Sequence, residues 1–278
     1  MNLYTIDTGF FKLDGGAMFG VVPKSLWQRT NPADENNLCT WATRLLLIEN
    51  GNRLTLVDTA LGDKQDAKFF GHYFLHGDDT LDKSLAKLGF HRDDITDVFL
   101  THLHFDHCGG AIKRENDKYI PAFKNANYWS NEEHWNWATI DPNPREKASF
   151  LIENIQPIKE SGQLKFISEG QAYDEKFEVR YAYGHTEAMM LPQIQYKGKT
   201  ILYMADLLPS IGHIPLPYVM SYDVRPLVTM NERKSYWQEA VDNEYILFLE
   251  HDPVNECCTL QQTEKGIRVK DVFKLSEI

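Results

Sequence analysis

The sequence has no hydrophobic run long enough to cross a bilayer, and its N-terminal residues lack the basic start and apolar core of a signal peptide. Cysteine is also scarce. The four cysteines are Cys39, Cys108, Cys257 and Cys258, and no CxxC pair occurs. These absences argue against a membrane partner, a disulfide framework and a thiolate zinc site. We therefore expect a cytoplasmic protein.

Positive charge is in short supply. Lysine and arginine number 29 against 40 aspartates and glutamates, which gives a formal net charge of −11 over 278 residues. No run of basic residues could offset the phosphates of a nucleic acid, so nucleic acid is not an expected partner. The 42% of hydrophobic residues is ordinary for a globular protein. Because no linker or low-complexity tract interrupts the chain, we expect a single domain over residues 1–278.

Four short apolar runs each end at a polar residue suited to metal binding. They are Leu54–Val57 before Asp58, Val98–Leu100 before Thr101 and His102, Ile201–Met204 before Asp206, and Ile246–Leu249 before Glu250 and His251. Such runs are typical of strands that are buried on both faces. Polar groups just beyond strand ends gather at one edge of a sheet, so the four runs predict one shared site.

Helices are predicted between these strands. Leucines at helical spacing predict a helix over 80–88 with Gly89 as its C-terminal cap, and a capping box predicts one over 229–241. The segment 143–160 is expected to be helical in part, ending early at Pro157. The tail 257–273 is expected to form strands around a turn at Gly266. The segment 9–40 has no clear period, and its aromatic content predicts a long functional loop. The mixture indicates an α/β class of layered fold.

The densest chemical signal is the segment from His102 to His107, which contains three histidines and an aspartate in six residues. If the preceding strand continues to His104, then His102 and His104 lie on one face, because side chains alternate along an extended chain. Gathering three imidazoles and a carboxylate without a cation would be costly. The segment therefore predicts a metal site.

This HxHxDH pattern resembles the signature of the metallo-β-lactamase superfamily. Further matches follow in the expected order: the Gly184-His185-Thr186 segment, Asp206 as a bridging aspartate and His251 as a last histidine. Asp58 is similar to an early strand-end aspartate that orients a ligand. The resemblance implies an α/β fold of the four-layer αββα sandwich type.

The resemblance also implies a ligand set for two metal ions. His102, His104 and His185 would hold the first ion, Asp106, His107 and His251 the second, and Asp206 would bridge both. Imidazoles and carboxylates without thiolates suit zinc, with manganese and iron as alternatives. We expect two zinc ions that share a hydroxide of lowered pKa, with Asp58 orienting an imidazole.

By this resemblance the protein is a hydrolase that opens a lactone or an ester, most similar to the N-acyl homoserine lactonases, which act in quorum quenching. The small-molecule substrate would carry an apolar acyl or aryl part. Asp106 would shuttle a proton, and His213, Tyr218 or Tyr222 would assist the oxyanion. One departure concerns the histidine loop, which reads Gly184-His185-Thr186-Glu187-Ala188-Met189 where those lactonases commonly carry GHTPGH.

Several alternatives stay open. The same pair of metals serves organophosphate and aryl ester hydrolases, and thioesterases share the fold. A metal-stabilised binding protein without turnover is a non-enzymatic alternative. The aromatic segment around Tyr128, Trp129, Trp135 and Trp137 is either a pocket wall or the face of a homodimer.

Overall fold

The computed structural model describes residues 1–278, which divide into two compact units. The first unit comprises Met1–Gly9 and Thr43–Glu169, and the second comprises Phe10–Ala42 and Gly170–Ile278. Strands β1 (Asn2–Asp14) and β2 (Leu38–Asn50) each contribute residues to both units. The expectation of one domain over 1–278 stays a prediction.

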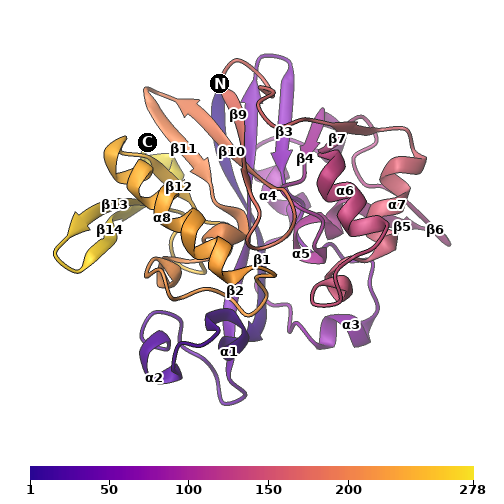
Figure 1. Ribbon diagram of the computed structural model, residues 1–278. Coiled ribbons are helices and arrows are strands. Elements are labelled where there is room, and N and C mark those ends of the chain that lie inside the picture. The colour runs from indigo at the N-terminus through magenta and orange to yellow at the C-terminus, as the bar shows by residue number, and fades with distance from the viewer. The chain divides into compact units, whose positions relative to one another are not determined.

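The first unit is built on a six-stranded sheet of order β1-β2-β3-β4-β7-β8 (Figure 1). Its other strands are β3 (Arg53–Val57), β4 (Asp97–Phe99), β7 (Asn127–Ser130) and β8 (Leu164–Phe166), and a separate hairpin joins β5 (Ile112–Glu115) to β6 (Lys118–Pro121). Its helices are α3 (Ala67–Gly71), α4 (Leu81–Lys87), α5 (Phe105–Cys108), α6 (Glu132–Thr139) and α7 (Ile152–Glu160). Strands β3, β4, β7 and β8 run parallel, so polar residues beyond their carboxyl ends can gather at one sheet edge.

Both helices predicted for the first unit are present, but the predicted end of the second one is wrong. Thr80 caps α4 through its side chain, which accepts from the Lys83 backbone N–H, and Gly89 follows with a φ of 83°. Helix α7, in contrast, does not end early but contains Pro157. Ile155 and Ile158, on either side of this proline, are fully buried in the core of the unit. Burial of this apolar face therefore outweighs the missing hydrogen bond.

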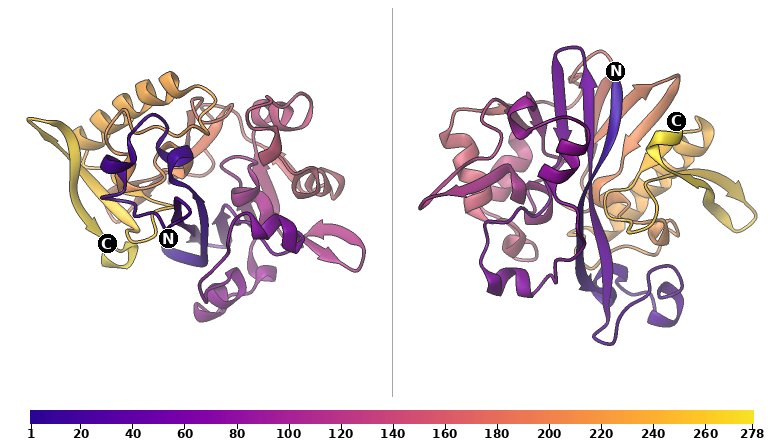
Figure 2. Two further views of the ribbon diagram at one scale, coloured as in Figure 1. Left: turned by 90° about the horizontal axis from the view of Figure 1, so that it is seen from below. Right: turned by 180° about the vertical axis from the view of Figure 1, so that it is seen from behind.

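The second unit contains another six-stranded sheet, of order β14-β13-β12-β11-β10-β9. The strands are β9 (Phe177–Ala182), β10 (Met189–Tyr196), β11 (Lys199–Tyr203), β12 (Ile246–Phe248), β13 (Cys257–Thr263) and β14 (Gly266–Phe273). The helices are α1 (Gly15–Phe19), α2 (Lys24–Trp27) and α8 (Pro226–Asp242). Helix α8 packs against β13, and the β13–β14 hairpin projects beside it (Figure 2). Short 3-10 turns occur in both units.

The four predicted strand ends are confirmed: β3, β4, β11 and β12 each stop just before the polar residues named above. The capping-box prediction is wrong. Helix α8 begins at Pro226, which has no backbone N–H to leave unpaired, and the Glu232 carboxylate accepts from the backbone N–H groups of Tyr183 and Gly184 instead. Sheets flanked by helices confirm the α/β class.

The aromatic segment 9–40 has no periodic hydrophobic pattern and is therefore predicted to be a long loop, but it is not one. Gly9–Asp14 extends β1, and α1 and α2 follow before β2 begins at Leu38. Phe19 stacks on Trp27 with ring centroids 5.2 Å apart, and both side chains are buried. The aromatic residues thus form a local core of the second unit. No helix of the structure combines the length and apolar character needed to cross a membrane.

Candidate metal centre

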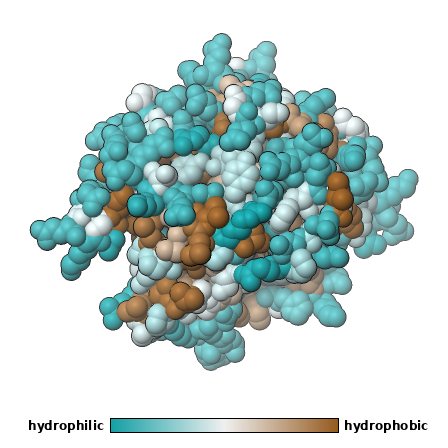
Figure 3. All heavy atoms as spheres, viewed as in Figure 1, coloured by the Kyte–Doolittle hydropathy of each residue, from teal (hydrophilic) through white to brown (hydrophobic).

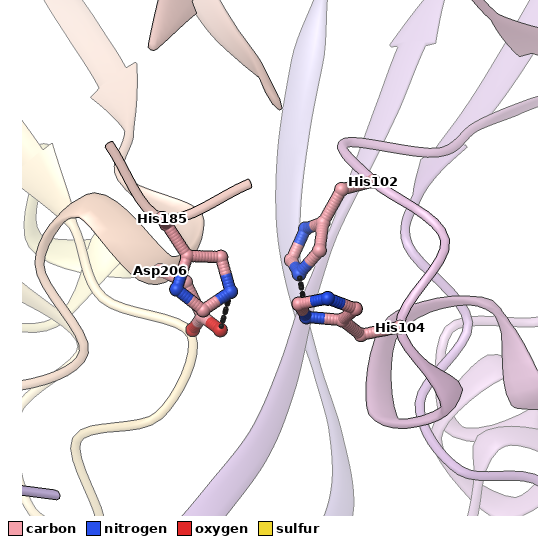
Figure 4. A group of neighbouring side chains, drawn as sticks. All are labelled: His102, His104, His185 and Asp206. Carbon is pink, nitrogen blue, oxygen red and sulfur yellow. Dashed lines mark hydrogen bonds and ion pairs between the residues drawn. The ribbon is translucent and has the colours of Figure 1, made fainter. Parts of the chain in front are cut away.

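In the first unit, the histidine motif occupies the connection between a strand and a helix. Strand β4 ends at Phe99 and α5 begins at Phe105, so His102 and His104 lie in a loop and not on the extended strand considered above. The His102 Nε2 and His104 Nδ1 atoms nevertheless lie 3.1 Å apart (Figure 4). Two imidazole nitrogens directed at each other this closely can share a cation.

The opposite nitrogens of these rings contact other groups. Thr101 Oγ1 lies 3.0 Å from His102 Nδ1, and it donates to Asp58 Oδ2 at 2.7 Å. Asp58 Oδ2 also accepts from His107 Nδ1 at 3.1 Å. Asp58, fully buried with a φ of 59°, therefore orients two parts of the motif from the end of β3. The His107 Nε2 atom is left on the side of Asp106, whose Oδ2 lies 3.9 Å away.

A carboxylate that the sequence did not indicate orients His104. Glu146 Oε2 lies 2.9 Å from His104 Nε2, and Glu146 Oε1 accepts from Trp137 Nε1 at 2.5 Å. The carboxylate is buried between these two partners. It favours the tautomer of His104 that carries its proton on Nε2 and leaves Nδ1 able to bind a cation. Glu146 lies in an irregular segment 42 positions after His104, where no spacing rule could have found it.

In the second unit, Asp206 directs its two oxygens at two different imidazoles. Oδ2 lies 3.0 Å from His185 Nε2 (Figure 4), and Oδ1 lies 3.1 Å from His251 Nε2. Asp206 follows β11, and the preceding Ala205 has a φ of 41°, in the region that favours glycine. A carboxylate with one histidine nitrogen facing each oxygen has the arrangement that a bridging ligand needs.

The Nδ1 atoms of His185 and His251, on the ring side away from Asp206, also have hydrogen-bond partners. The His185 Nδ1 atom lies 3.0 Å from Asp223 Oδ1, and His251 Nδ1 lies 2.8 Å from the Ala42 carbonyl oxygen. Burial tends to lower the pKa of His185, but the carboxylates of Asp206 and Asp223 outweigh it and raise that pKa to about 10. Asp223 was missed by the sequence analysis, because it stands alone in an irregular segment 38 positions after His185.

Helix α8 holds the loop before His185 and the loop after Asp206. Glu232 binds the loop before His185 through the Tyr183 and Gly184 N–H groups, at 2.6 and 3.1 Å. The neighbouring Arg233 is fully buried and donates to backbone carbonyls of the loop after Asp206, those of Leu207, His213 and Tyr218. Two adjacent side chains of one helix therefore fix both loops.

The candidates for oxyanion assistance lie in different environments. His213 is fully buried and stacks on Phe19, with Nδ1 2.9 Å from Ser210 Oγ and Nε2 2.9 Å from the Met18 carbonyl oxygen. Burial and the charge of Arg233 lower the pKa of His213 to about 3. Since both ring nitrogens are engaged, His213 holds its loop and has no nitrogen to offer a substrate. Tyr218 packs edge-on against Phe19, and Tyr222 is exposed.

Glu187, the first residue that departs from the GHTPGH pattern, has a structural role of its own. Glu187 forms an ion pair with Arg225, which also donates to the Tyr183 carbonyl oxygen at 2.7 Å. The backbone N–H of Arg225 donates to the Gly184 carbonyl oxygen at 2.8 Å. The segment that carries His185 is therefore held by Arg225 as well as by Glu232.

The donor atoms of each unit fit a divalent cation. The side chains whose nitrogens and oxygens could hold a metal ion include His102, His104, Asp106 and His107 in the first unit and His185, Asp206 and His251 in the second. They include no thiolate, and buried partners orient the histidines, as is usual for zinc ligands. Divalent metals are thus the cofactor that these groups can hold.

Gly109, which follows the histidine motif, allows a close backbone approach. A Cβ atom at this position would lie 2.1 Å from the Leu61 carbonyl oxygen, a group of the backbone that cannot move aside cheaply. We expect Gly109→Ala to lower the free energy of unfolding by about 2 kcal/mol or more. Urea denaturation would measure this change. Gly71→Ala is the matched control, since nothing lies within 4 Å of its Cβ position, and equal stabilities of the two variants would contradict the packing argument.

Comparison with known proteins identifies the family. The model of the metallo-β-lactamase superfamily matches residues 42–250. The chain belongs to the metallo-β-lactamase superfamily. The metallo-β-lactamase fold, which the histidine motif predicts, is confirmed.

Solved structures of similar fold cover nearly the whole chain. A probable metal-dependent hydrolase from Staphylococcus aureus is 24% identical, with a TM-score of 0.88 over 98% of this chain and 96% of its own. AidC, a dizinc quorum-quenching lactonase, is 23% identical, with a TM-score of 0.79 over 98% and 95%. The hydrolase AbOPH of the beta lactamase superfamily is 18% identical, with a TM-score of 0.80 over 98% and 94%. These similarities show the shared fold.

Proposed function

We propose that the protein is a dinuclear metal hydrolase that opens the ring of an N-acyl homoserine lactone. The seven proposed ligands are His102, His104, Asp106, His107, His185, Asp206 and His251, and zinc is the proposed metal. The single observation that carries the proposal is Asp206, whose two oxygens each face the Nε2 atom of a different histidine. One carboxylate with two such partners is suited to two cations, not one.

The chain's own residues would prepare the reaction. When bound, a pair of divalent cations supplies an activated water molecule and polarises the carbonyl group of the substrate. Asp58, Glu146 and Asp223 hold the imidazoles in fixed orientations, so little reorganisation is needed during the reaction. Asp106 would receive a proton and return it to the leaving oxygen of the opened ring. Tyr218 and Tyr222 stay as candidates for assisting the oxyanion.

An aromatic cluster beside Asp106 supports a substrate with an apolar acyl chain. The Phe105 ring lies 5.3 Å from that of Phe69 and 4.7 Å from that of Tyr73, measured between centroids. Burial and the nearby charge of Asp106 raise the pKa of Tyr73. AidC, which shares the fold, is named as a lactonase, and its structure holds the product N-hexanoyl-L-homoserine. Both observations favour an acyl lactone.

A hydrolysis panel tests the proposal. Zinc-loaded protein is given acyl homoserine lactones of several chain lengths, aryl esters, a phosphotriester and lactoylglutathione, and initial rates are compared at equal concentration. We expect the acyl homoserine lactones to have the highest kcat/KM, rising with chain length as more apolar surface is buried. A higher kcat/KM for the phosphotriester or the thioester would show that the proposed substrate class is wrong. Two bound metals with no hydrolysis of any substrate would favour a binding protein.

A further inference from the structure

A groove of about 1080 Å3 lies beside helix α8 in the second unit. One wall is a polar face of that helix, formed by residues at helical spacing: Asn231, Lys234, Ser235, Gln238 and Asp242. The β13–β14 turn and residues 214–217 form the other walls. None of the groove-lining residues is a proposed metal ligand. The volume is slightly above the usual range of small-molecule sites, which ends at about 1,000 Å3.

Positive charge is left unpaired in this groove. Lys234, Lys265 and Arg268 line it, are exposed, and form no ion pair in the structure. The two carboxylates of the groove, in contrast, are already engaged. Glu239 accepts two bonds from Arg180, at 3.0 and 2.9 Å, and Asp242 accepts from Gln238 at 2.8 Å. Of the four cationic side chains that line the groove, only Arg180 is paired, and the other three face it in a protein whose net charge is −11.

We propose that this groove binds a small phosphorylated molecule with at least two phosphate groups. Neighbouring cations without a partner repel one another, and an anion that bridges them relieves this repulsion. Arginine offers a planar pair of donors that matches a phosphate group, and lysines add point charges. The remaining lining, from Pro215 to Pro217 and at Ile267, would accept the uncharged part of the molecule. The overall acidity of the chain disfavours a nucleic-acid polymer.

The surface agrees with this composition. Hydrophilic side chains cover the tip of the β13–β14 hairpin, and hydrophobic ones lie beside the hairpin, on the side of α8 (Figure 3). The lining of the groove therefore combines charged and apolar side chains, which suits a phosphorylated molecule with an organic body.

The inner wall of the groove is connected to the loop after Asp206. Trp237 Nε1 donates to the Ile214 carbonyl oxygen at 2.9 Å, and both residues line the groove. Arg233, on the same helix, holds the carbonyl oxygens of His213 and Tyr218. A ligand in the groove would contact residues 214–217 and thereby stabilise the loop after Asp206.

Titration calorimetry with pyrophosphate and ADP tests the proposal on the metal-loaded protein. The comparison variant is K234Q/K265Q/R268Q, which keeps all seven proposed metal ligands. Any binding at a metal centre is then common to both proteins, and their difference reports the groove. We expect the triple variant to bind both probes about tenfold more weakly or worse. The control K199Q/K270Q, whose lysines line another cavity of the second unit, is expected to bind like the natural sequence.

Hydrogen exchange provides a second readout. ADP is expected to slow exchange in residues 207–218 of the natural sequence and not in the triple variant. Equal affinity of the natural sequence and the triple variant would overturn the proposal, as would the absence of binding of both probes at millimolar concentration. The proposal does not depend on the hydrolytic function, because Asp206→Asn is expected to remove hydrolysis and leave binding in the groove unchanged.

Discussion

Asp206→Asn is expected to lower kcat/KM for the hydrolysed lactone by about a thousandfold or more, since metal activation contributes several kcal/mol to such reactions. The amide keeps the size of the side chain but removes its charge and replaces one of the two oxygens that face the histidines with an NH2 group. His185 and His251 then no longer face two equivalent oxygens. The metal content, measured by mass spectrometry, should fall from two ions per chain to one or fewer.

Asp242→Asn is the matched control for this variant. Asp242 ends helix α8 in the same unit and accepts from Gln238, on the exposed side of the helix. Its replacement should leave the metal content and kcat/KM within about twofold, as is usual for surface substitutions. If Asp206→Asn keeps two metals and full turnover, the bridging role is wrong.

Asp223→Asn is expected to weaken the binding of at least one metal by about 10- to 100-fold, the usual effect of losing a group that orients a metal ligand. Asp223 is not one of the seven proposed metal ligands. Its carboxylate lies 3.0 Å from His185 Nδ1, so it holds the proton on Nδ1 and keeps Nε2 available. An asparagine lacks the charge that stabilises this arrangement. Competition with a chromophoric chelator would measure the change.

Two controls distinguish the loss of His185 orientation from a loss of protein stability in Asp223→Asn. Thermal unfolding of the metal-free variant controls for a folding defect, and the NMR signals of the imidazole N–H protons report the tautomer of His185 directly. We expect a changed His185 signal together with the weaker metal binding. Unchanged metal affinity, or an equal loss in Asp242→Asn, would show that Asp223 does not position His185.

The parts of the fold that depend on neighbouring residues were predictable from the sequence. The apolar runs before Asp58, His102, Asp206 and His251 became β3, β4, β11 and β12, because buried strands carry a local hydrophobic signal. Boundaries set by tertiary packing were not predictable. Helix α7 continues through Pro157 because Ile155 and Ile158 pack in the core, and nothing local to the proline reveals that packing.

In the candidate site, too, residues with a local sequence signal were predictable and isolated residues were not. The histidine motif was visible because its members are consecutive, whereas Glu146 and Asp223 are isolated carboxylates that act on histidines 42 and 38 positions away. His213 shows the opposite case. Its place near Asp206 in the sequence predicts a catalytic role, but the folded chain engages both its ring nitrogens with Ser210 and Met18. Sequence proximity alone did not reveal which atoms were free.

Anomalous diffraction from crystals of the zinc-loaded protein, recorded on both sides of the zinc edge, distinguishes a dinuclear centre from a single metal site. We predict two zinc peaks per chain about 3.5–4 Å apart, with one oxygen of Asp206 next to each. We also expect His102, His104 and His185 around one peak, and Asp106, His107 and His251 around the other. A single peak, or two peaks with Asp206 bound to neither, would show that Asp206 does not bridge two metals.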